Sequence, residues 1–155
     1  MRLISICPSN TELAAYLGLT DDLIAVDDYS DWPELVNNLP RLGPDLSINM
    51  DLVEQLQPDL VLASLSVPGM EKNVEELIKR NIPHLVLNPQ SFEDIGNDLM
   101  AVGIAAGKEK EAKAVVSRYY GILKDYKEKA SKLVNRPSVY FEWWPNPIFT
   151  PGQVN

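Results

Sequence analysis

The strongest constraint on the fold of this 155-residue chain is the alternation of short apolar runs with helical stretches. Four runs have the length and composition of buried parallel strands, and they cover residues 3–7, 23–26, 60–64 and 83–87. Parallel strands joined by helical crossovers form a sheet that is covered by helices on both faces. The pattern therefore predicts an α/β lobe over residues 1–107, with a parallel sheet sandwiched between helices.

Several residues have the positions of helix caps. Ser9 and Glu12 have the spacing of a capping box, so we expect Ser9 to cap a helix that follows the first strand. Asn49 and Ser91 are expected to cap two later helices in the same lobe. These caps predict where the helices of the lobe begin.

Residues 108–134 differ from the rest of the chain because they contain no proline and form one amphipathic stripe. About 26 residues of helix span about 40 Å, roughly twice the length of a typical globular helix. We interpret residues 108–136 as a helix that connects two bodies, although one arm of a dimer is an alternative. A strand is expected over residues 138–143, and residues 137–155 are interpreted as the start of a second lobe that the chain does not complete.

Composition excludes several classes of protein. The chain has 22 acidic and 14 basic side chains, which argues against a nucleic-acid partner because phosphate binding needs clustered Lys and Arg. Residues 108–136 hold nine of those basic side chains, which predicts a solvated basic helix or, as an alternative, a contact surface. No apolar run has the roughly 18 to 20 residues of a membrane helix. The first residues also lack the pattern of a secretory signal, so the protein is either cytoplasmic or has its export segment outside this sequence.

The sequence lacks the residue groupings of a catalytic or metal site. It contains none of the glycine-rich phosphate motifs and no nucleophile elbow. His84 and Cys7 are the single residues of their types, and both are expected to be structural. Asp27, Asp28 and Asp31 could supply oxygen ligands to Ca²⁺ or Mg²⁺, but their spacing is not that of an EF-hand loop, and turn formation is the favoured interpretation. We therefore expect no catalytic residue and no metal ligand.

Polar and aromatic residues follow the predicted strands, at the edge where open parallel sheets bind ligands. Hydroxyls and amides at a helix start, beside aromatic rings on loops, suit a large, flat and partly polar ligand. Trp32 could instead cover the core. The two adjacent tryptophans point to opposite faces of a strand, so at most one is expected to face a ligand. The expected ligand-binding residues are Pro8, Ser9, Asn10, Tyr29, Trp32, Ser64, Trp143 and Trp144.

Four segments carry a resemblance to a known family. RLISICPSNTELAAYLGL, YSDWP and INMDLVEQLQPDLVLAS resemble the first lobe of the cobalamin and iron-siderophore binding proteins of bacterial ABC importers. FEWWPNPIFTPG is similar to the opening of the second lobe in the cobalamin-binding branch. The resemblance implies two α/β lobes joined by one rigid interlobe helix, with the ligand in the cleft between them.

The resemblance also implies roles for individual residues. Tyr29 matches a ring that packs against the corrin in cobalamin binders, and Trp32 falls on an aromatic position of the same motif. Asp51 matches an acidic residue, usually Glu in the family, that docks the lobe onto arginines of the membrane permease. The chain departs from the family at residues 44–46, where some cobalamin binders carry a Trp. The metal-binding relatives use several His ligands, and this chain has only one histidine, His84, so direct transport of a metal ion is disfavoured.

These observations favour a binding module and leave two alternatives open. The first hypothesis is an extracytoplasmic solute-binding protein that captures cobalamin or a related corrinoid and delivers it to an ABC transporter permease. An Fe-siderophore or haem is the alternative ligand. A cytoplasmic cofactor-handling protein or enzyme with the same fold is the alternative class, because a fold does not fix a function.

Overall fold

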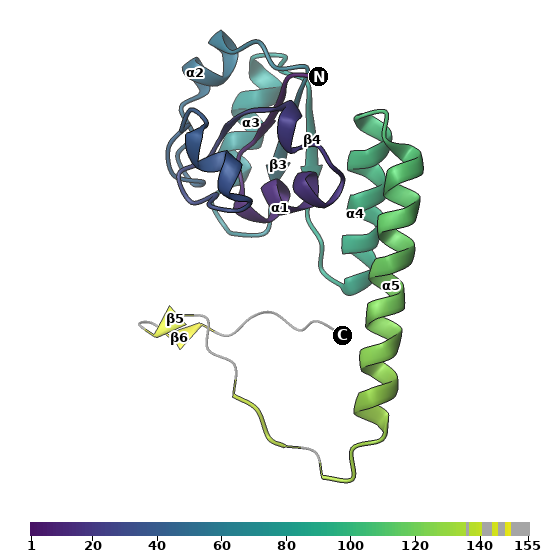
Figure 1. Cartoon of the computed structure of the whole chain (residues 1–155). Coiled ribbons are helices and arrows are strands. Elements are labelled where there is room, and N and C mark those ends of the chain that lie inside the picture. Colours follow the sequence, from purple (N-terminus) through teal and green to yellow (C-terminus); the bar gives the residue numbers. More distant parts are fainter. Residues whose placement is uncertain (136, 141–143, 146–147, 150–155) are drawn as a thin grey trace.

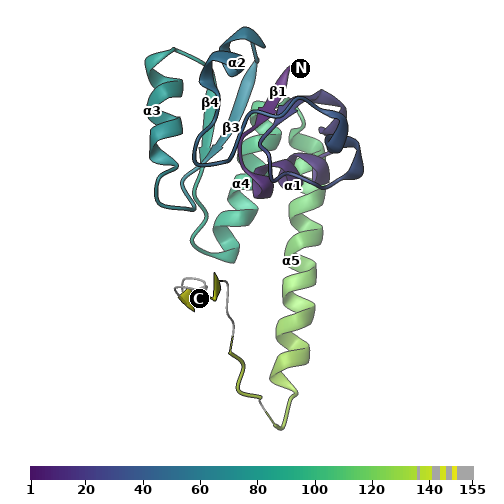
Figure 2. The ribbon, with the colours of Figure 1, turned by 90° about the vertical axis from the view of Figure 1, so that its left-hand side faces the viewer.

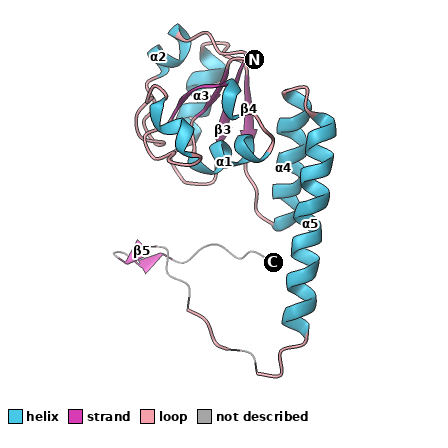
Figure 3. Ribbon diagram, in the orientation of Figure 1, coloured by secondary structure: helices cyan, strands magenta, loops and turns pink. Residues whose placement is uncertain are grey.

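Four strands form one parallel sheet in the order β2-β1-β3-β4. The computed structural model describes residues 1–135, 137–140, 144–145 and 148–149. Figures 1 and 3 show the sheet inside a lobe built from the first part of the chain. The predicted α/β class with a parallel sheet is confirmed. The strands are β1 (Leu3–Ser5), β2 (Leu23–Val26), β3 (Leu60–Ser64) and β4 (His84–Leu87).

Helices cover both faces of this sheet. Alternate strand residues point to opposite sides, and the apolar side chains on each side are buried beneath helices. Leu3 and Leu62 belong to the core cluster beneath α1 and α4, whereas Ile4 and Val61 belong to the cluster beneath α2 and α3. Figure 2 shows the two helix layers on either side of the strands. The lobe contains α1 (Pro8–Tyr16), α2 (Met50–Gln55), α3 (Glu71–Lys79) and α4 (Phe92–Ala105), with 3-10 turns η1 (Thr20–Asp22) and η2 (Glu34–Asn38).

Two of the three predicted helix caps are present. The Asn49 side chain accepts a hydrogen bond from the Leu52 N–H, and the Ser91 hydroxyl accepts one from the Asp94 N–H, each at 3.1 Å. The predicted Ser9 cap is wrong: Cys7 is the N-cap of α1, and it makes no side-chain cap bond among the described residues.

Proline explains why α1 starts earlier than predicted. Pro8 occupies the first turn of α1, where its fixed φ suits a helix and its missing N–H leaves nothing unsatisfied. Ser9 therefore lies inside the first turn, and its hydroxyl contacts the Cys7 Sγ at 3.3 Å instead of capping the helix.

The predicted long helix is present as α5 (Glu109–Ser131), which extends well past the lobe in Figures 1 and 2. Its first turns pack tightly on α4, since a Cβ at Gly103 would overlap Ala112 and a Cβ at Gly96 would overlap Tyr120. Its later turns expose large apolar side chains such as Tyr126, which is 66% exposed. Within the described residues, no helix combines the length and apolar character needed to cross a membrane.

The region after α5 departs from the predicted single strand over residues 138–143. Residues 138–140 are described, and they are exposed and have no regular secondary structure. A strand needs a hydrogen-bonded neighbour, and the structure assigns these three residues none; residues 141–143 lie outside the described residues. A short antiparallel pair follows, formed by β5 (Trp144–Pro145) and β6 (Ile148–Phe149).

Candidate functional site

The carboxyl ends of β1, β2 and β3 meet at one edge of the sheet, which we call the strand-end edge. It comprises residues 7–10, 27–30 and 64–66. The neighbouring strands β1 and β3 lead into helices on opposite faces, α1 and α3 respectively. Open α/β sheets bind ligands at the position where the helices diverge in this way.

The first turn of α1 contributes three predicted ligand residues, which differ in exposure. Pro8 is half-buried and Ser9 is exposed, so the Ser9 side chain is available at the edge. Asn10 is 2% exposed, and its Nδ2 donates to the Ala63 carbonyl at 2.9 Å. The Asn10 amide therefore ties α1 to β3 instead of facing outward.

The loop after β2 is organised by Asp27. This carboxylate is buried, and its Oδ1 accepts hydrogen bonds from the N–H groups of Tyr29 (2.8 Å) and Ser30 (3.1 Å). Burial raises the pKa of Asp27, although the hydrogen bonds from Ser30 and Tyr29 lower it in part. The turn leaves the Tyr29 ring 58% exposed at the strand-end edge. The expected turn-forming role of this aspartate is confirmed.

The acidic cluster of this loop makes backbone contacts. Asp28 accepts a hydrogen bond from the Gly43 N–H at 3.1 Å, which joins the loop to the segment after η2. Across the described residues, no group of three or more His, Cys, Asp and Glu side chains is arranged to hold a metal ion.

The hydroxyl expected at the end of β3 is engaged within the protein. Ser64 is 4% exposed, and its Oγ lies 2.8 Å from Ser66 Oγ and accepts the Ser66 N–H. Ser66 is exposed, so it presents the outer hydroxyl of this segment. Ser64 is the last residue of β3 and is buried, whereas Ser66 lies two residues beyond the strand and is exposed. The distance from the strand end was therefore the sequence signal for the exposed hydroxyl.

Trp32 lies beside the end of α1 that is distant from Ser9. Trp32 packs against Tyr16 with ring centroids 5.4 Å apart, and Tyr16 ends α1 about 12 Å along the helix from its start. Trp144 begins β5, and Trp143 lies outside the described residues. The structure thus brings Ser9 and Tyr29 to one edge and holds Trp32 beside the far end of α1.

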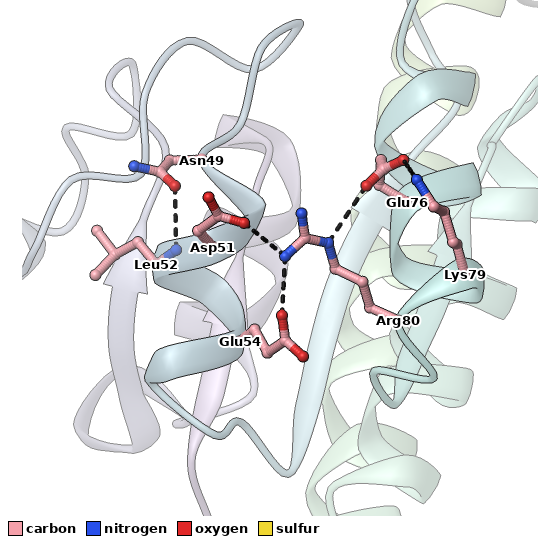
Figure 4. Close-up of polar contacts among 7 residues, drawn as sticks. All are labelled: Asn49, Asp51, Leu52, Glu54, Glu76, Lys79 and Arg80. Atoms are coloured by element: carbon pink, nitrogen blue, oxygen red, sulfur yellow. Dashed lines mark hydrogen bonds and ion pairs between the residues drawn. The ribbon is translucent and has the colours of Figure 1, made fainter.

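Asp51, the predicted docking residue, lies in an ion-pair cluster between α2 and α3 (Figure 4). Arg80 Nη1 donates to Asp51 Oδ1 at 2.7 Å and to Glu54 Oε2 at 2.8 Å, while its Nε donates to Glu76 Oε2 at 3.3 Å. The hydrogen bonds to Asp51 and then Glu54 raise the pKa of Arg80 further. The Asp51 side chain remains 77% exposed, so it is accessible to a partner.

Two hollows lie along α5. An open hollow of about 760 Å³ is lined by residues that include Phe92, Tyr120 and Lys127. A smaller one of about 420 Å³ lies between Tyr16 and Tyr119. Both follow the helix where it leaves the lobe.

The sequence did not predict the polar contacts that support the edge. Thr11 and Ser30 join α1 to the loop after β2, and Arg41 donates to carbonyls of the same loop. Ser30 lies four residues after the end of β2 and Thr11 lies six residues after the end of β1, which was the available signal; Arg41 has no comparable signal in the sequence.

A family model described as periplasmic binding protein matches residues 3–153 of the chain. An uncharacterised ABC transporter substrate-binding lipoprotein, YvrC of Bacillus subtilis (strain 168), is 34% identical over 98% of this chain and 50% of its own length. A vitamin B12-binding protein of Yersinia pestis (strain Pestoides F) is 27% identical over 96% of this chain and 52% of its own length. The chain thus spans about half the length of these curated relatives.

Solved structures agree with the fold. The periplasmic vitamin B12 binding protein BtuF of Vibrio cholerae superposes with a TM-score of 0.82 and 25% identity, over 95% of this chain and 57% of that one. The periplasmic haem-binding protein RhuT from Roseiflexus sp. RS-1 superposes with a TM-score of 0.80, over 92% of this chain and 54% of that one. Its 20% identity supports a shared fold alone.

Proposed function

The chain belongs to the periplasmic binding protein family, and from this premise we propose that it forms the first lobe and interlobe helix of an ABC importer's substrate-binding protein. The proposed division is a lobe over residues 1–107, an interlobe helix over 108–136 and the start of a second lobe over 137–155. The later turns of α5 support this division, because Ile122 and Tyr126 are 47% and 66% exposed. Apolar side chains gathered on one helix suit contact with a further body.

The proposed ligand is cobalamin or a related corrinoid, captured at the strand-end edge. The observation that carries this proposal is the Tyr29 ring, which stands exposed on a hydrogen-bonded loop at the edge that also includes Ser9. A flat macrocycle would bury the face of such a ring, and the adjacent hydroxyls and N–H groups suit its polar rim. The vitamin B12-binding relatives support the same ligand class.

The proposed partner is the permease of the importer, with Asp51 as a docking residue. The exposure of Asp51 supports this role, and so does its distance from the ligand edge: α2 and α1 lie toward opposite ends of the lobe in Figures 1 and 2. A carboxylate at an interface rim steers association and sets register more than it adds affinity. The lipoprotein relative supports an extracytoplasmic location for the protein.

Calorimetry on the natural protein that contains this sequence tests the ligand. Cyanocobalamin, haemin and a ferric hydroxamate siderophore are titrated separately into the wild type and into two variants at Tyr29. We expect cyanocobalamin to bind, Tyr29→Ala to weaken it by up to about tenfold, and Tyr29→Phe to retain most of the affinity because the ring is kept.

Other outcomes redirect the proposal. Binding of haemin or the siderophore, with no heat from cyanocobalamin, would contradict the corrinoid ligand and support the alternative ligand class. An equal loss of cyanocobalamin affinity in Tyr29→Ala and Tyr29→Phe would show that the ring face is not the contact.

A further inference from the structure

The loop that carries Tyr29 is built around a buried carboxylate. Asp27 is 0% exposed, and its Oδ1 accepts the N–H groups of Tyr29 and Ser30. Its Oδ2 accepts the Ser30 hydroxyl at 2.5 Å, a length typical of a hydrogen bond to an ionised acceptor. Three hydrogen bonds to one side chain thus define the turn that leaves the Tyr29 ring exposed.

Buried hydroxyls join this turn to α1. Ser30 Oγ lies 2.7 Å from Thr11 Oγ1, and Thr11 Oγ1 lies 2.8 Å from Ser5 Oγ. All three residues are at most 2% exposed, so solvent does not compete for these contacts. Because Thr11 lies two residues after Ser9, the chain of hydroxyls couples the loop after β2 to the first turn of α1.

The Arg41 side chain binds main-chain carbonyls of the same turn. Its Nη1 donates to the carbonyl of Asp27 at 2.8 Å and to that of Ser30 at 2.6 Å. Residue 41 also forms a β-bridge with Val26, the last residue of β2. The two ends of the turn are therefore bound both to each other and to the edge of the sheet.

We propose that Asp27 is a positioning residue, which fixes the loop so that Tyr29 and Ser9 form one ligand-facing surface before any ligand binds. The proposal rests on the proposed function, because Tyr29 is the ligand contact in both. A loop already fixed in its bound conformation loses less conformational freedom on binding, so its order contributes directly to affinity.

Backbone amide exchange measured by NMR on this chain tests the positioning without any ligand. We expect Asp27→Ala to speed exchange of the Tyr29 and Ser30 amides by about tenfold or more, since their acceptor is removed. Asp27→Asn keeps one acceptor oxygen and should restore much of the protection. Asp31→Ala, at an exposed position of the same loop, is the matched control and should leave both amides unchanged.

A double-mutant cycle with cyanocobalamin as the probe tests whether Asp27 acts through Tyr29. In the natural protein, Asp27→Ala should weaken binding by about tenfold in the wild-type background and have little effect in the Tyr29→Ala background. General damage to the lobe would instead lower affinity by the same factor in both backgrounds, and that result would overturn the proposal.

The remaining outcomes separate this proposal from the ligand assignment. If the wild type does not bind cyanocobalamin, the corrinoid proposal fails, and the exchange experiment alone decides the role of Asp27. Equal exchange in Asp27→Ala and Asp31→Ala would then overturn the positioning role. Should Asp27→Ala not fold, Ser30→Ala removes only the hydroxyl link, and protection of the loop amides equal to that of the wild type would count against the proposal.

Discussion

Two aspartates of the lobe, Asp27 and Asp51, have the same functional group in opposite surroundings. Asp27 is fully buried, and both of its oxygens accept hydrogen bonds from groups within three residues in the sequence. The Asp51 side chain is 77% exposed, and its oxygen accepts from Arg80, which lies 29 residues away on α3. The first arrangement shapes the chain locally, and the second leaves a charge at the surface.

The difference in burial decides what each carboxylate contributes. A buried acceptor that loses its partners costs the full desolvation of the groups left behind, whereas an exposed ion pair exchanges its partner for water at little cost. Asp27 should therefore matter for stability and for the order of the loop. Asp51 should matter for association with a partner and hardly at all for the fold.

Removing the buried carboxylate should give the largest effect. Asp27→Ala deprives two N–H groups and one hydroxyl of their acceptor, so we expect the free energy of unfolding to fall by about 2 to 3 kcal/mol. Urea unfolding followed by far-UV circular dichroism at pH 7 measures the change. Asp31→Ala is the control, and equal losses in the two variants would remove the contrast between the buried and exposed positions.

Asp98, a third aspartate of the lobe, is partly buried. Its Oδ2 has no hydrogen-bond partner among the described residues. Burial, and then the nearby charge of Asp94, raise the pKa of Asp98 from 3.8 to about 6. The folded state thus favours the protonated form, and this advantage is present below pH 3.8 and lost as the pH rises through about 6.

Asp98→Asn should therefore stabilise the chain at high pH only. At pH 8 we expect a gain of about 1 kcal/mol, less than the full pKa shift would give because solvent screens a partly exposed group. The gain should shrink toward zero between pH 8 and pH 4.5, as measured by urea unfolding across that range. Glu93→Gln, at an exposed position of α4, should show no such trend; a pH-independent gain in Asp98→Asn would contradict the assignment.

The sequence predicted those features that depend on local patterns. Apolar runs of strand length located all four strands, and Asn49 and Ser91 capped their helices because capping involves residues only three apart. The prediction of a Ser9 cap was wrong because two local signals competed. The capping-box spacing favoured a start at Ser9, but Pro8 suits the first turn of a helix, and α1 begins there, one residue earlier in the sequence.

The partners of the supporting contacts at the candidate site could not be read from local patterns. Thr11 meets Ser30 across 19 residues, and the packing of α1 on the sheet determines that contact. Trp32 was predicted as a ligand residue or as a cover of the core, and its ring contact with Tyr16 depends on the path of its loop. Contacts between distant segments depend on how the whole fold is assembled. A local sequence pattern does not show which two residues will meet.

The smallest effect on stability is expected at Asp51. Asp51→Asn should leave urea unfolding unchanged, because Arg80 keeps its bonds to Glu54 and Glu76 and exposed ion pairs contribute little. Binding to the cognate permease in nanodiscs should nevertheless weaken on the order of tenfold at low salt, with a smaller difference at 0.5 M salt, where steering is screened. Glu75→Gln, which neutralises an exposed carboxylate of α3, is the matched control. Equal weakening by both variants would mean that the permease senses the net charge of this surface and not the carboxylate of Asp51, and the functional contrast with Asp27 would then rest on the buried site alone.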